Sequence, residues 1–443
     1  MMTTVKSGQR SGSVKVPASK SVVHRMLICS ALSNARVTVG AEHISKDIEA
    51  TVACLAGMGA EIKVTPGRID ILSGLTKGGE CFVNCGESGS TLRFLIPVAA
   101  ALGKTVHFKM EGLLSKRPHD VLTNELMRHG AVILQTGDVL NVSGQIKPGK
   151  YEIPGNISSQ FISGLLFALP LLNGDSDIII TGKRESVSYI NMTLDALEES
   201  GVRIEETKDG YFVPGKARFC RSGFCEAERD WSGAAFFMCM GAMSDDGITL
   251  ENMNVSSHQG DMKVMKILKD FGAEINIVSA GSGNDIKNDK LRMPENDSEA
   301  MGAKEKAFAD ISVKKGKCLP CEIDASDIPD LVPVLSVLMC AAEGKSVIKN
   351  AQRLRLKESD RLETTSGMIR ALGGDVRVTE DGLEILGTGS LKGGTVDAAN
   401  DHRIAMSAAT AASICTGEVI IPGSQCADKS YPGFFDDLES LKK

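Results

Sequence analysis

The stretch CLAGMGAEIKVTPGRIDILSG, residues 54–74, contains the pattern that decides the fold: the end of an apolar helix, a glycine, and two short strands joined by a turn. The pattern recurs at 125–144, 196–215, 267–278 and 368–387. A glycine just past a helix is typical of a C-cap, because glycine adopts a left-handed backbone at little cost. The spacings between these glycines, 71, 71, 71 and 101 residues, indicate a repeat: Gly59, Gly130, Gly201, Gly272 and Gly373.

A second pattern, an Ala/Leu-rich helix that leads into a β-branched strand, interleaves with the first. Six units of about 70 residues therefore fill the chain, and three units make a domain of plausible size. We predict two similar α/β domains with sheets packed against helices, divided near residues 224–231. The extra residues in the longest spacing between glycines form a polar stretch near 279–308, which predicts a surface insertion. The six strands begin near Val37, Val106, Ile178, Ile248, Val347 and Val419.

Composition excludes several classes of protein. The 443 residues carry a net charge of -6 and include only 14 Phe, 4 Tyr and 1 Trp, which argues against a nucleic-acid partner. The N-terminal MMTTVKSGQRSG lacks the apolar core of a signal peptide, and FISGLLFALPLL is too short to span a bilayer. We therefore expect a cytoplasmic protein without membrane contact.

The 12 cysteines are scattered along the chain, so we expect reduced core thiols. The CxxC of Cys318 and Cys321 lacks the second pair of a zinc site.

Charged residues recur at the starts of the predicted helices. If the units share one orientation, most helix N-termini lie on the same side of each domain. Their free N–H groups and positive dipole ends then lie close to several cationic side chains, which predicts a site for an anionic small molecule. These cations are Lys20, Arg25, Arg93, Arg117, Lys357, Arg361, Arg403 and Lys429.

For each cluster a structural role competes with a functional one. GESGST at 86–91 is also an ordinary N-cap, and it lacks the GK[ST] ending of a P-loop. In LRLKESDRL, Lys357 and Arg361 on one helix would be like charges four residues apart, which favours an anion between them over a solvated face. Asp327 reads as a helix cap, which leaves Asp330 without a structural role. Simple capping is the competing role for Ser158–Gln160, and a structural ion pair is the competing role for Asp401–Arg403.

Eight motifs in order carry a resemblance to a known family. They are ASKSVVHR, NCGESGSTLRF, SKRP, SSQF, IPDLVPVL, LRLKESDRL, NDHRIAMS and KSYPGFF. Together they closely resemble the 5-enolpyruvylshikimate-3-phosphate synthase family of enolpyruvyl transferases, from about Ser13 to the C-terminus. KESDRL and NDHRIAM are the most specific of them.

The resemblance implies a fold and a reaction. The fold is α/β, with two similar inside-out domains of three βαβαββ repeats and the active site in the cleft between them. The N-terminal domain would be 19–227, on the shikimate-phosphate side, and the C-terminal domain 1–18 plus 228–443. Strand GSVKVPA would pair within the C-terminal domain. The implied enzyme transfers the enolpyruvyl group of phosphoenolpyruvate to the 5-hydroxyl of shikimate 3-phosphate and releases phosphate, as a monomer without metal or organic cofactor.

The family's residues are carried over position by position. Asp330 would accept the 5-hydroxyl proton, Glu358 and Lys20 are the candidates for protonating the methylene carbon, and Lys357 would neutralise charge. The shikimate 3-phosphate ligands would be Lys20, Ser21, Arg25, Ser158, Ser159, Gln160, Ser186, Tyr189, Asp330 and Lys357. The phosphoenolpyruvate ligands would be Lys20, Gly89, Ser90, Arg117, Gln160, Arg361, Arg403 and Lys429. Supporting residues would be Asp47, Arg93, Asp230, Asp401 and His402.

Three positions depart from the family's wording. The loop often written GNAGTAMRP is GESGSTLRF here, with Glu87 for Asn and Phe94 for Pro, so we expect Glu87 to point away from the pocket. Arg353 stands where some relatives carry Asn. The alternatives are a UDP-N-acetylglucosamine enolpyruvyl transferase, which lacks KESDRL, an RNA 3'-phosphate cyclase, which the acidic charge opposes, and a non-catalytic phospho-ligand-binding homologue.

Overall fold

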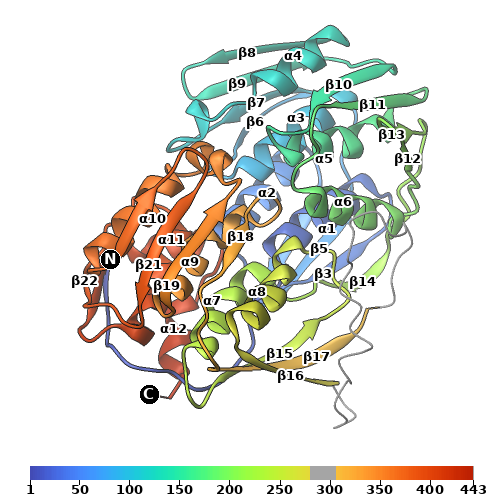
Figure 1. Cartoon of the computed structure of the whole chain (residues 1–443). Helices are drawn as coiled ribbons and strands as arrows, with labels where there is room; N and C mark the ends of the chain where they lie inside the picture. The colour runs from blue at the N-terminus through green and yellow to red at the C-terminus, as the bar shows by residue number, and fades with distance from the viewer. Residues whose placement is uncertain (280–305, 443) are drawn as a thin grey trace. The chain divides into compact units, whose positions relative to one another are not determined.

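The computed structural model describes residues 1–279 and 306–442, which form two compact units (Figure 1). The N-terminal unit consists of residues 20–227. The C-terminal unit consists of residues 1–19 together with 228–279 and 306–442. The polar insertion predicted near 279–308 lies almost wholly outside the described residues.

The N-terminal unit is built from three repeats of two helices and several strands. The second and third repeats each begin with a strand that pairs in parallel with the strand after the first helix, and each ends with an antiparallel hairpin. The elements are α1 (Lys20–Leu32), β3 (Val37–Gly40), α2 (Lys46–Gly57), β4 (Glu61–Thr65), β5 (Arg68–Ser73), β6 (Glu80–Asn84), α3 (Gly89–Ala101), β7 (Thr105–Lys109), η1 (Leu114–Lys116), α4 (Asp120–Arg128), β8 (Ala131–Thr136), β9 (Val139–Gly144), β10 (Lys150–Pro154), α5 (Ser159–Ala168), η2 (Leu169–Leu171), β11 (Ser176–Thr181), α6 (Val187–Glu198), β12 (Glu205–Thr207), β13 (Gly210–Val213) and β14 (Gly223–Glu226).

The first repeat lacks a leading strand, and the end of the unit supplies one. Strand β14 pairs in parallel with β3, which gives the order β14-β3-β5-β4 beside β6-β7-β9-β8 and β10-β11-β13-β12. All three sheets therefore have four strands in the same arrangement. The pairing covers an edge of β3 that would otherwise expose unpaired N–H and C=O groups.

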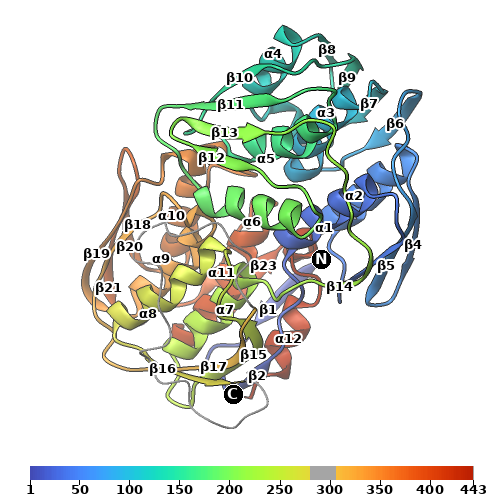
Figure 2. The same ribbon diagram turned by 90° about the vertical axis from the view of Figure 1, so that its right-hand side faces the viewer.

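Helices α1, α3 and α5 lie in the interior of this unit, with the sheets around them (Figure 2). In α3 every residue except Ser90 is buried, and in α5 every residue except Gln160. A helix that is apolar on all sides must be enclosed by protein. The two exceptions are both polar and both lie in the first turn of their helix, where the site is built.

The C-terminal unit repeats this plan. Its sheets have the orders β16-β17-β15-β2, β18-β19-β21-β20 and β1-β23-β22. The elements are β1 (Met2–Val5), β2 (Gly12–Val14), α7 (Trp231–Ala242), β15 (Ile248–Asn254), η3 (Gly260–Lys263), α8 (Val264–Phe271), β16 (Glu274–Ser279), β17 (Phe308–Lys314), β18 (Glu322–Asp324), η5 (Pro329–Leu331), α9 (Val332–Cys340), β19 (Glu343–Lys349), η6 (Gln352–Leu356), α10 (Arg361–Ala371), β20 (Asp375–Val378), β21 (Leu383–Thr388), β22 (Gly394–Thr395), α11 (His402–Ala411), η7 (Ala412–Ile414), β23 (Val419–Pro422), η8 (Ser424–Lys429) and α12 (Phe434–Ser440).

The N-terminus completes two of these sheets. Strand β2 pairs in parallel with β15, as the resemblance implied for GSVKVPA, and β1 pairs antiparallel with β23. The last repeat ends in α12 without a hairpin of its own, so β1 takes the place beside β23 that the hairpin fills elsewhere. One apolar core joins α7, α9 and α11 with the inner faces of these sheets.

The glycines that defined the repeat behave as predicted. Gly59, Gly130, Gly201, Gly272 and Gly373 have φ values of 107°, 111°, 77°, 91° and 84°. In this left-handed region glycine avoids the strain that a Cβ atom brings. The prediction of C-caps is confirmed.

The prediction of core thiols holds for some of the cysteines but not for Cys81, Cys220, Cys225, Cys318 and Cys321, which are not buried. All 12 lie among the described residues, and seven of them are buried. Burial raises the pKa of the Cys29, Cys340 and Cys415 thiols, which keeps them protonated at neutral pH. Within the described ranges, no helix is long and apolar enough to cross a membrane.

Candidate active site

In both units, side chains at the N-termini of different helices contact one another, as the repeat predicted. Lys20 at the start of α1 contacts Asp47 in the first turn of α2. In the other unit, Arg361 at the start of α10 contacts Asp401, the N-cap of α11. Helix N-termini present free N–H groups and positive dipole ends, so each unit gathers an environment that favours anions.

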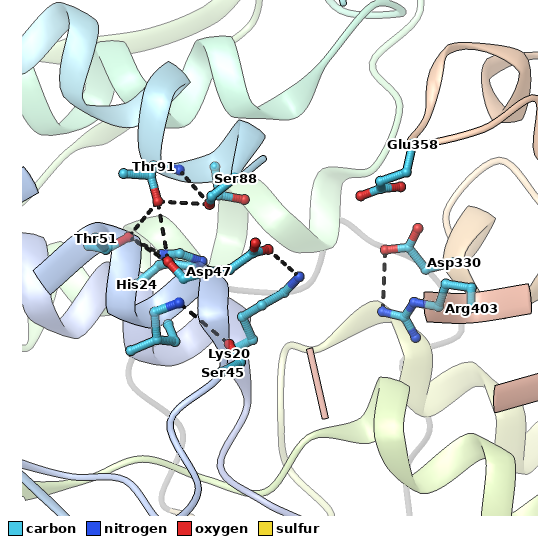
Figure 3. A network of polar contacts seen from close by, with 12 residues as sticks. Lys20, His24, Ser45, Asp47, Thr51, Ser88, Thr91, Asp330, Glu358 and Arg403 are labelled. Atoms are coloured by element: carbon cyan, nitrogen blue, oxygen red, sulfur yellow. Dashed lines mark hydrogen bonds and ion pairs between the residues drawn. The ribbon is translucent and has the colours of Figure 1, made fainter. Parts of the chain in front are cut away.

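The Lys20–Asp47 pair lies beside a buried polar network in the N-terminal unit (Figure 3). Lys20 Nζ lies 2.8 Å from Asp47 Oδ2, and both side chains are about one-sixth exposed, at 17% and 16%. Ser45 caps α2 by accepting a hydrogen bond from the N–H of Ile48. The helix cap therefore fixes the turn that holds Asp47.

Arg25 lies below the surface and holds two other predicted ligands by their backbone. Its guanidinium donates to the carbonyls of Ser21 and Tyr189, both at 2.7 Å, and to Thr193 Oγ1 at 2.8 Å. Burial lowers the pKa of Arg25 to about 10, so it remains charged at neutral pH. Ser186, the N-cap of α6, has a left-handed backbone with φ of 53° and makes no side-chain cap bond. A serine in this region is strained, which is common at functional sites.

Arg93, Gln160 and Ser90 form a second group in this unit. Arg93 donates to Gln160 Oε1 at 2.7 Å, and Gln160 Nε2 donates to Ser90 Oγ at 2.9 Å. Arg93 also donates to the carbonyl of Pro118 at 3.0 Å, which joins α3 to the SKRP loop. Ser158 caps α5 by accepting from the N–H of Gln160. The capping role that competed with ligand binding at Ser158 is therefore present.

Arg117 lies against the backbone of Gly89. A Cβ atom on Gly89 would lie 2.9 Å from Arg117 NH1, closer than side chains tolerate. The Arg117 Nε is buried and has no hydrogen-bond partner. The carboxyl group of Glu87 lies beside Gly112, where a Cβ atom would be 2.7 Å from the carboxyl carbon.

Phe94, which stands where the family often has proline, is packed in the core of this unit. Its ring lies edge-on to Phe167 with centroids 5.5 Å apart, and the guanidinium carbon of Arg25 lies 5.2 Å from its centroid. A cation over an aromatic face is attracted by the negative electrostatic potential of the ring. This contact supports the position of the buried Arg25.

The predicted acid/base residues of the C-terminal unit lie in one cluster of carboxylates and cations. Asp330 Oδ1 accepts from Arg361 NH1 at 2.7 Å and from Lys357 at 3.4 Å, and its Oδ2 lies 3.7 Å from Arg403 NH2. Glu358 also accepts from Arg361 NH2. Figure 3 shows Asp330, Glu358 and Arg403 from this cluster.

The cluster keeps Asp330 ionised. Burial raises the pKa of its carboxyl group, but Lys357, Arg403 and Arg361 outweigh burial and hold the pKa well below the ordinary value. Burial lowers the pKa of Lys357, which Asp330 offsets in part. At neutral pH, Asp330 is thus an anion surrounded by cations.

Asp401 fixes the buried Arg361. Its carboxylate accepts from Arg361 Nε at 2.7 Å and NH2 at 3.3 Å, and it caps α11 through the N–H of Arg403. His402 and Arg403 are buried at the start of α11. Lys429 donates to the carbonyl of Asn400 at 2.7 Å, just before α11 begins.

The remaining predicted residues of this unit have structural contacts. Asp230 is the N-cap of α7 and accepts from the N–H of Gly233 at 3.0 Å. Arg353 in η6 donates to the carbonyl of Ser326 at 2.6 Å.

Two local predictions were wrong. Lys357 and Arg361 do not share a helix: η6 ends at Leu356, and α10 begins at Arg361 after three bent residues, 357–359, and the N-cap Asp360. The break allows both cations to reach Asp330, whereas a continuous helix would have set them one above the other. Asp327 caps no helix; its carboxylate pairs with Lys263 at 2.8 Å, and the N-cap of η5 is Ile328.

Sequence reasoning missed a second buried layer. In the N-terminal unit His24, Thr51, Ser88 and Thr91 are linked by hydrogen bonds. In the C-terminal unit the buried Asp261 accepts from Ser232 Oγ. His24 stands inside the motif ASKSVVHR at the start of α1, and Asp261 stands in η3 just before α8, so a position near a helix N-terminus was the available signal. Within the described ranges, no group of three His, Cys, Asp or Glu side chains is arranged to hold a metal ion.

Comparison with known proteins shows the family. The family model described as EPSP synthase (3-phosphoshikimate 1-carboxyvinyltransferase) matches residues 5–438. The chain belongs to the EPSP synthase family. A 3-phosphoshikimate 1-carboxyvinyltransferase of Clostridium acetobutylicum is 40% identical over 438 residues, covering 97% of this chain and 95% of the relative. One of Clostridium kluyveri is 39% identical over 441 residues, with the same coverage.

Solved structures confirm the fold class of this EPSP synthase family member. An EPSP synthase of Acinetobacter baumannii aligns with a TM-score of 0.78 at 24% identity, covering 99% of this chain and 97% of that one. The enolpyruvyl transferase NikO of Streptomyces tendae aligns with a TM-score of 0.75 at 15% identity, with the same coverage. At these identities the likeness shows the fold alone: two α/β domains of the enolpyruvyl transferase type.

Proposed function

We propose that this chain transfers the enolpyruvyl group of phosphoenolpyruvate to the 5-hydroxyl of shikimate 3-phosphate and releases inorganic phosphate. Membership of the EPSP synthase family supports this reaction, and so do relatives named 3-phosphoshikimate 1-carboxyvinyltransferase at up to 40% identity. The observation that carries the proposal is the ionised Asp330 carboxylate surrounded by Lys357, Arg361 and Arg403. Such a cluster supplies both a proton acceptor and cations for substrate anions.

The proposed reaction has two steps. In the first, Asp330 accepts the 5-hydroxyl proton, the oxygen bonds to C2 of phosphoenolpyruvate, and an acid delivers a proton to C3. In the second, the tetrahedral intermediate loses phosphate from C2 and a proton from C3, which restores the double bond. Glu358 and Lys20 are the candidates for the acid at C3. The proposed reaction uses no cofactor. Protons enter and leave at two atoms, so an acid and a base on separate elements are needed.

The cations explain how a strongly acidic carboxyl group acts as a base. In the free protein Lys357, Arg361 and Arg403 stabilise the Asp330 anion and weaken its basicity. Substrate phosphate and carboxylate groups would share these cations, because forked guanidinium groups bind such anions in pairs of hydrogen bonds. Sharing the cations raises the pKa of Asp330 when substrate is bound, which increases its basicity at the moment of reaction.

The substrate ligands are proposed from both units. In the N-terminal unit, Lys20 and Gln160 are partly exposed at helix starts beside Asp47 and Ser90, where anions are favoured. Arg25 is enclosed by protein, so its proposed contribution acts through Ser21 and Tyr189, whose carbonyls it holds. Shikimate 3-phosphate is assigned to Lys20, Ser21, Arg25, Ser158, Ser159, Gln160, Ser186, Tyr189, Asp330 and Lys357. Phosphoenolpyruvate is assigned to Lys20, Gly89, Ser90, Arg117, Gln160, Arg361, Arg403 and Lys429.

Phosphate release tests the reaction. The purified chain should release phosphate only when phosphoenolpyruvate and shikimate 3-phosphate are both present. Turnover with UDP-N-acetylglucosamine in place of shikimate 3-phosphate would support the sister transferase instead. Binding of both substrates without phosphate release would support a non-catalytic homologue, and the relatives' names favour neither alternative.

Asp330→Asn tests the proposed base. The variant should keep substrate affinity and lose about 100- to 10,000-fold in kcat, as expected when a general base is removed. Asp327→Asn is the matched control, because Asp327 lies three residues earlier and pairs with Lys263 rather than with the cluster. Turnover of Asp330→Asn close to that of Asp327→Asn would remove Asp330 from the mechanism.

The proposal includes a cytoplasmic monomer whose partners are these two small molecules, without nucleic acid or membrane. Light scattering after size exclusion tests the monomer, and a mass of two chains would contradict it. Because ligands are assigned to both units, the units are proposed to close on the substrates. Small-angle scattering should then show a smaller radius of gyration with both ligands bound, and an unchanged radius would count against closure.

A further inference from the structure

Four buried side chains near Lys20 form a continuous chain of short hydrogen bonds (Figure 3). His24 Nδ1 lies 2.7 Å from Thr51 Oγ1, Thr51 Oγ1 lies 2.7 Å from Thr91 Oγ1, and Thr91 Oγ1 lies 2.7 Å from Ser88 Oγ. All four residues are at most 1% exposed. Three helices are joined in this way: α1 through His24, α2 through Thr51, and α3 through Thr91 and its cap Ser88.

The hydrogen count restricts the direction of this chain. Each hydroxyl group has one hydrogen, and both threonines have a second, longer acceptor in the carbonyl of Asp47, at 3.3 Å and 3.4 Å. The shorter contacts of 2.7 Å along the series take these hydrogens, so Thr51 and Thr91 each donate once and accept once there. Thr91 donates to Ser88, which leaves Thr51 donating to Thr91 and His24 Nδ1 donating to Thr51. The reverse direction would place a hydrogen on His24 Nε2, a buried atom without a partner. A buried N–H without an acceptor is rarer than an unused lone pair, so the direction from His24 to Ser88 is favoured.

The imidazole stays neutral in this setting. Burial holds the pKa of His24 well below its ordinary value, and the charges of Lys20 and Arg25 lower it further. A neutral ring has one donor nitrogen and one acceptor nitrogen, which the chain requires.

The chain joins two groups of proposed substrate ligands. Thr51 and Thr91 lie 3.3 Å and 3.4 Å from the backbone carbonyl of Asp47, whose carboxylate holds Lys20. At the other end, Ser88 precedes Gly89 and Ser90 and caps α3 by accepting from the N–H of Thr91. Movement of α2 relative to α3 would therefore break the chain and shift the Lys20 group away from the Gly89–Ser90 group.

We propose that His24, Thr51, Thr91 and Ser88 are positioning residues. They hold Lys20 and the Gly89–Ser90 loop in a fixed position relative to each other, so that both contact the same pair of substrates. The inference rests on the proposed function for what the two groups bind. A packed interface between helices could be made from apolar side chains alone, whereas hydrogen bonds depend on distance and direction and so select one arrangement of the helices. The hydroxyl chain fixes that arrangement where the first turns of α2 and α3 must keep a constant position relative to each other.

Thr91→Val tests the chain, because valine keeps the shape of threonine and removes the hydroxyl. We expect kcat/KM to fall roughly 10- to 100-fold, the loss that a displacement of about 1 Å produces. Thr91→Ser restores the hydroxyl and should return activity close to wild type. The matched control is Thr410→Val, since Thr410 is equally buried but bonds only the carbonyl of Met406 in its own helix.

Nitrogen NMR of the histidine side chains gives a readout that does not need turnover. The His24 ring should carry its hydrogen on Nδ1 in the wild type, assigned by its loss in His24→Asn, and Thr91→Val should shift this signal while Thr410→Val leaves it unchanged. A hydrogen on Nε2, or wild-type kinetics in Thr91→Val, would overturn the proposal. A wild-type chain that releases no phosphate would refute the proposed function, and the NMR result would still decide for or against the chain.

Discussion

The contact between Asp401 and Arg361 allows one stability prediction to be worked through. Asp401→Asn keeps the size of the side chain and its ability to cap α11, since asparagine is also a good N-cap. It removes a negative charge that is completely buried and accepts three side-chain hydrogen bonds, two from Arg361 and one from Ser359 at 3.0 Å. The substitution therefore isolates the charge from the helix cap.

The expected loss comes from the cation that is left behind. Breaking a buried ion pair by removing one partner costs about 3–5 kcal/mol, because the other charge stays buried. Arg361 retains Asp330 and Glu358 as partners, which places Asp401→Asn at the low end, about 3 kcal/mol. Asp401→Ala should lose about 1 kcal/mol more, because it also removes the cap.

Urea unfolding followed by tryptophan fluorescence measures this loss in the C-terminal unit, which carries the substitution. Trp231 is the single tryptophan of the chain and is buried in α7, in the same unit as Asp401. With a slope of about 2–3 kcal/mol per molar urea, the midpoint should fall by about 1 M or more. The fluorescence transition then reports the unit that carries the substitution.

Asp360→Asn is the matched control. Asp360 also caps a helix, α10, and pairs with Arg355 at 3.0 Å, but its side chain is 36% exposed. Exposed pairs contribute about 0–1 kcal/mol, so its midpoint should hardly move. Equal midpoints for the two variants would refute the argument that burial gives the Asp401 charge its importance.

Two further predictions follow from the site. Gly89→Ala should displace the Arg117 guanidinium, which the new Cβ would approach to 2.9 Å, and should raise the KM for phosphoenolpyruvate roughly tenfold or more. The control is Gly367→Ala, where the new Cβ meets nothing within 4 Å and the KM should stay unchanged. A normal KM in Gly89→Ala would contradict the contact between Gly89 and Arg117. Burial, and after it the charge of Asp330, raises the pKa of Asp261 to about 7, so the folded state holds a proton that the unfolded chain releases near its ordinary pKa of about 3.9. The free energy of unfolding should therefore fall as the pH rises from about 4 to about 7, and Asp261→Asn should remove this part of the fall; parallel pH curves of the two proteins in urea unfolding would refute it.

Much of the fold could be predicted, because the repeat leaves a periodic trace in the sequence. The five cap glycines required a left-handed backbone, and all five have one. The strands β14 and β1 left no comparable trace. Each is four residues long and pairs with a strand far away in the sequence, and such pairing depends on where the chain returns in space.

The candidate site could be predicted as a set of residues but not as an arrangement. The sequence placed Lys357 and Arg361 on one helix, and the structure separates them by a bend so that both contact Asp330. Local spacing predicted repulsion on a helix face, whereas a carboxylate 27 residues earlier than Lys357 decides the geometry. Asp327 likewise pairs with a distant lysine instead of capping a helix.

The sequence by itself determined the number of units, their helix ends and the types of charged residue gathered at helix starts, because these depend on period and on residue chemistry within a few positions. Only the tertiary structure decided which charges meet, which strands close the sheets, and that the hydroxyl groups of Thr51 and Thr91 share one chain with His24. Those contacts join residues 27 and 40 positions apart, and a hydrogen bond depends on distance in space, which spacing along the chain does not fix.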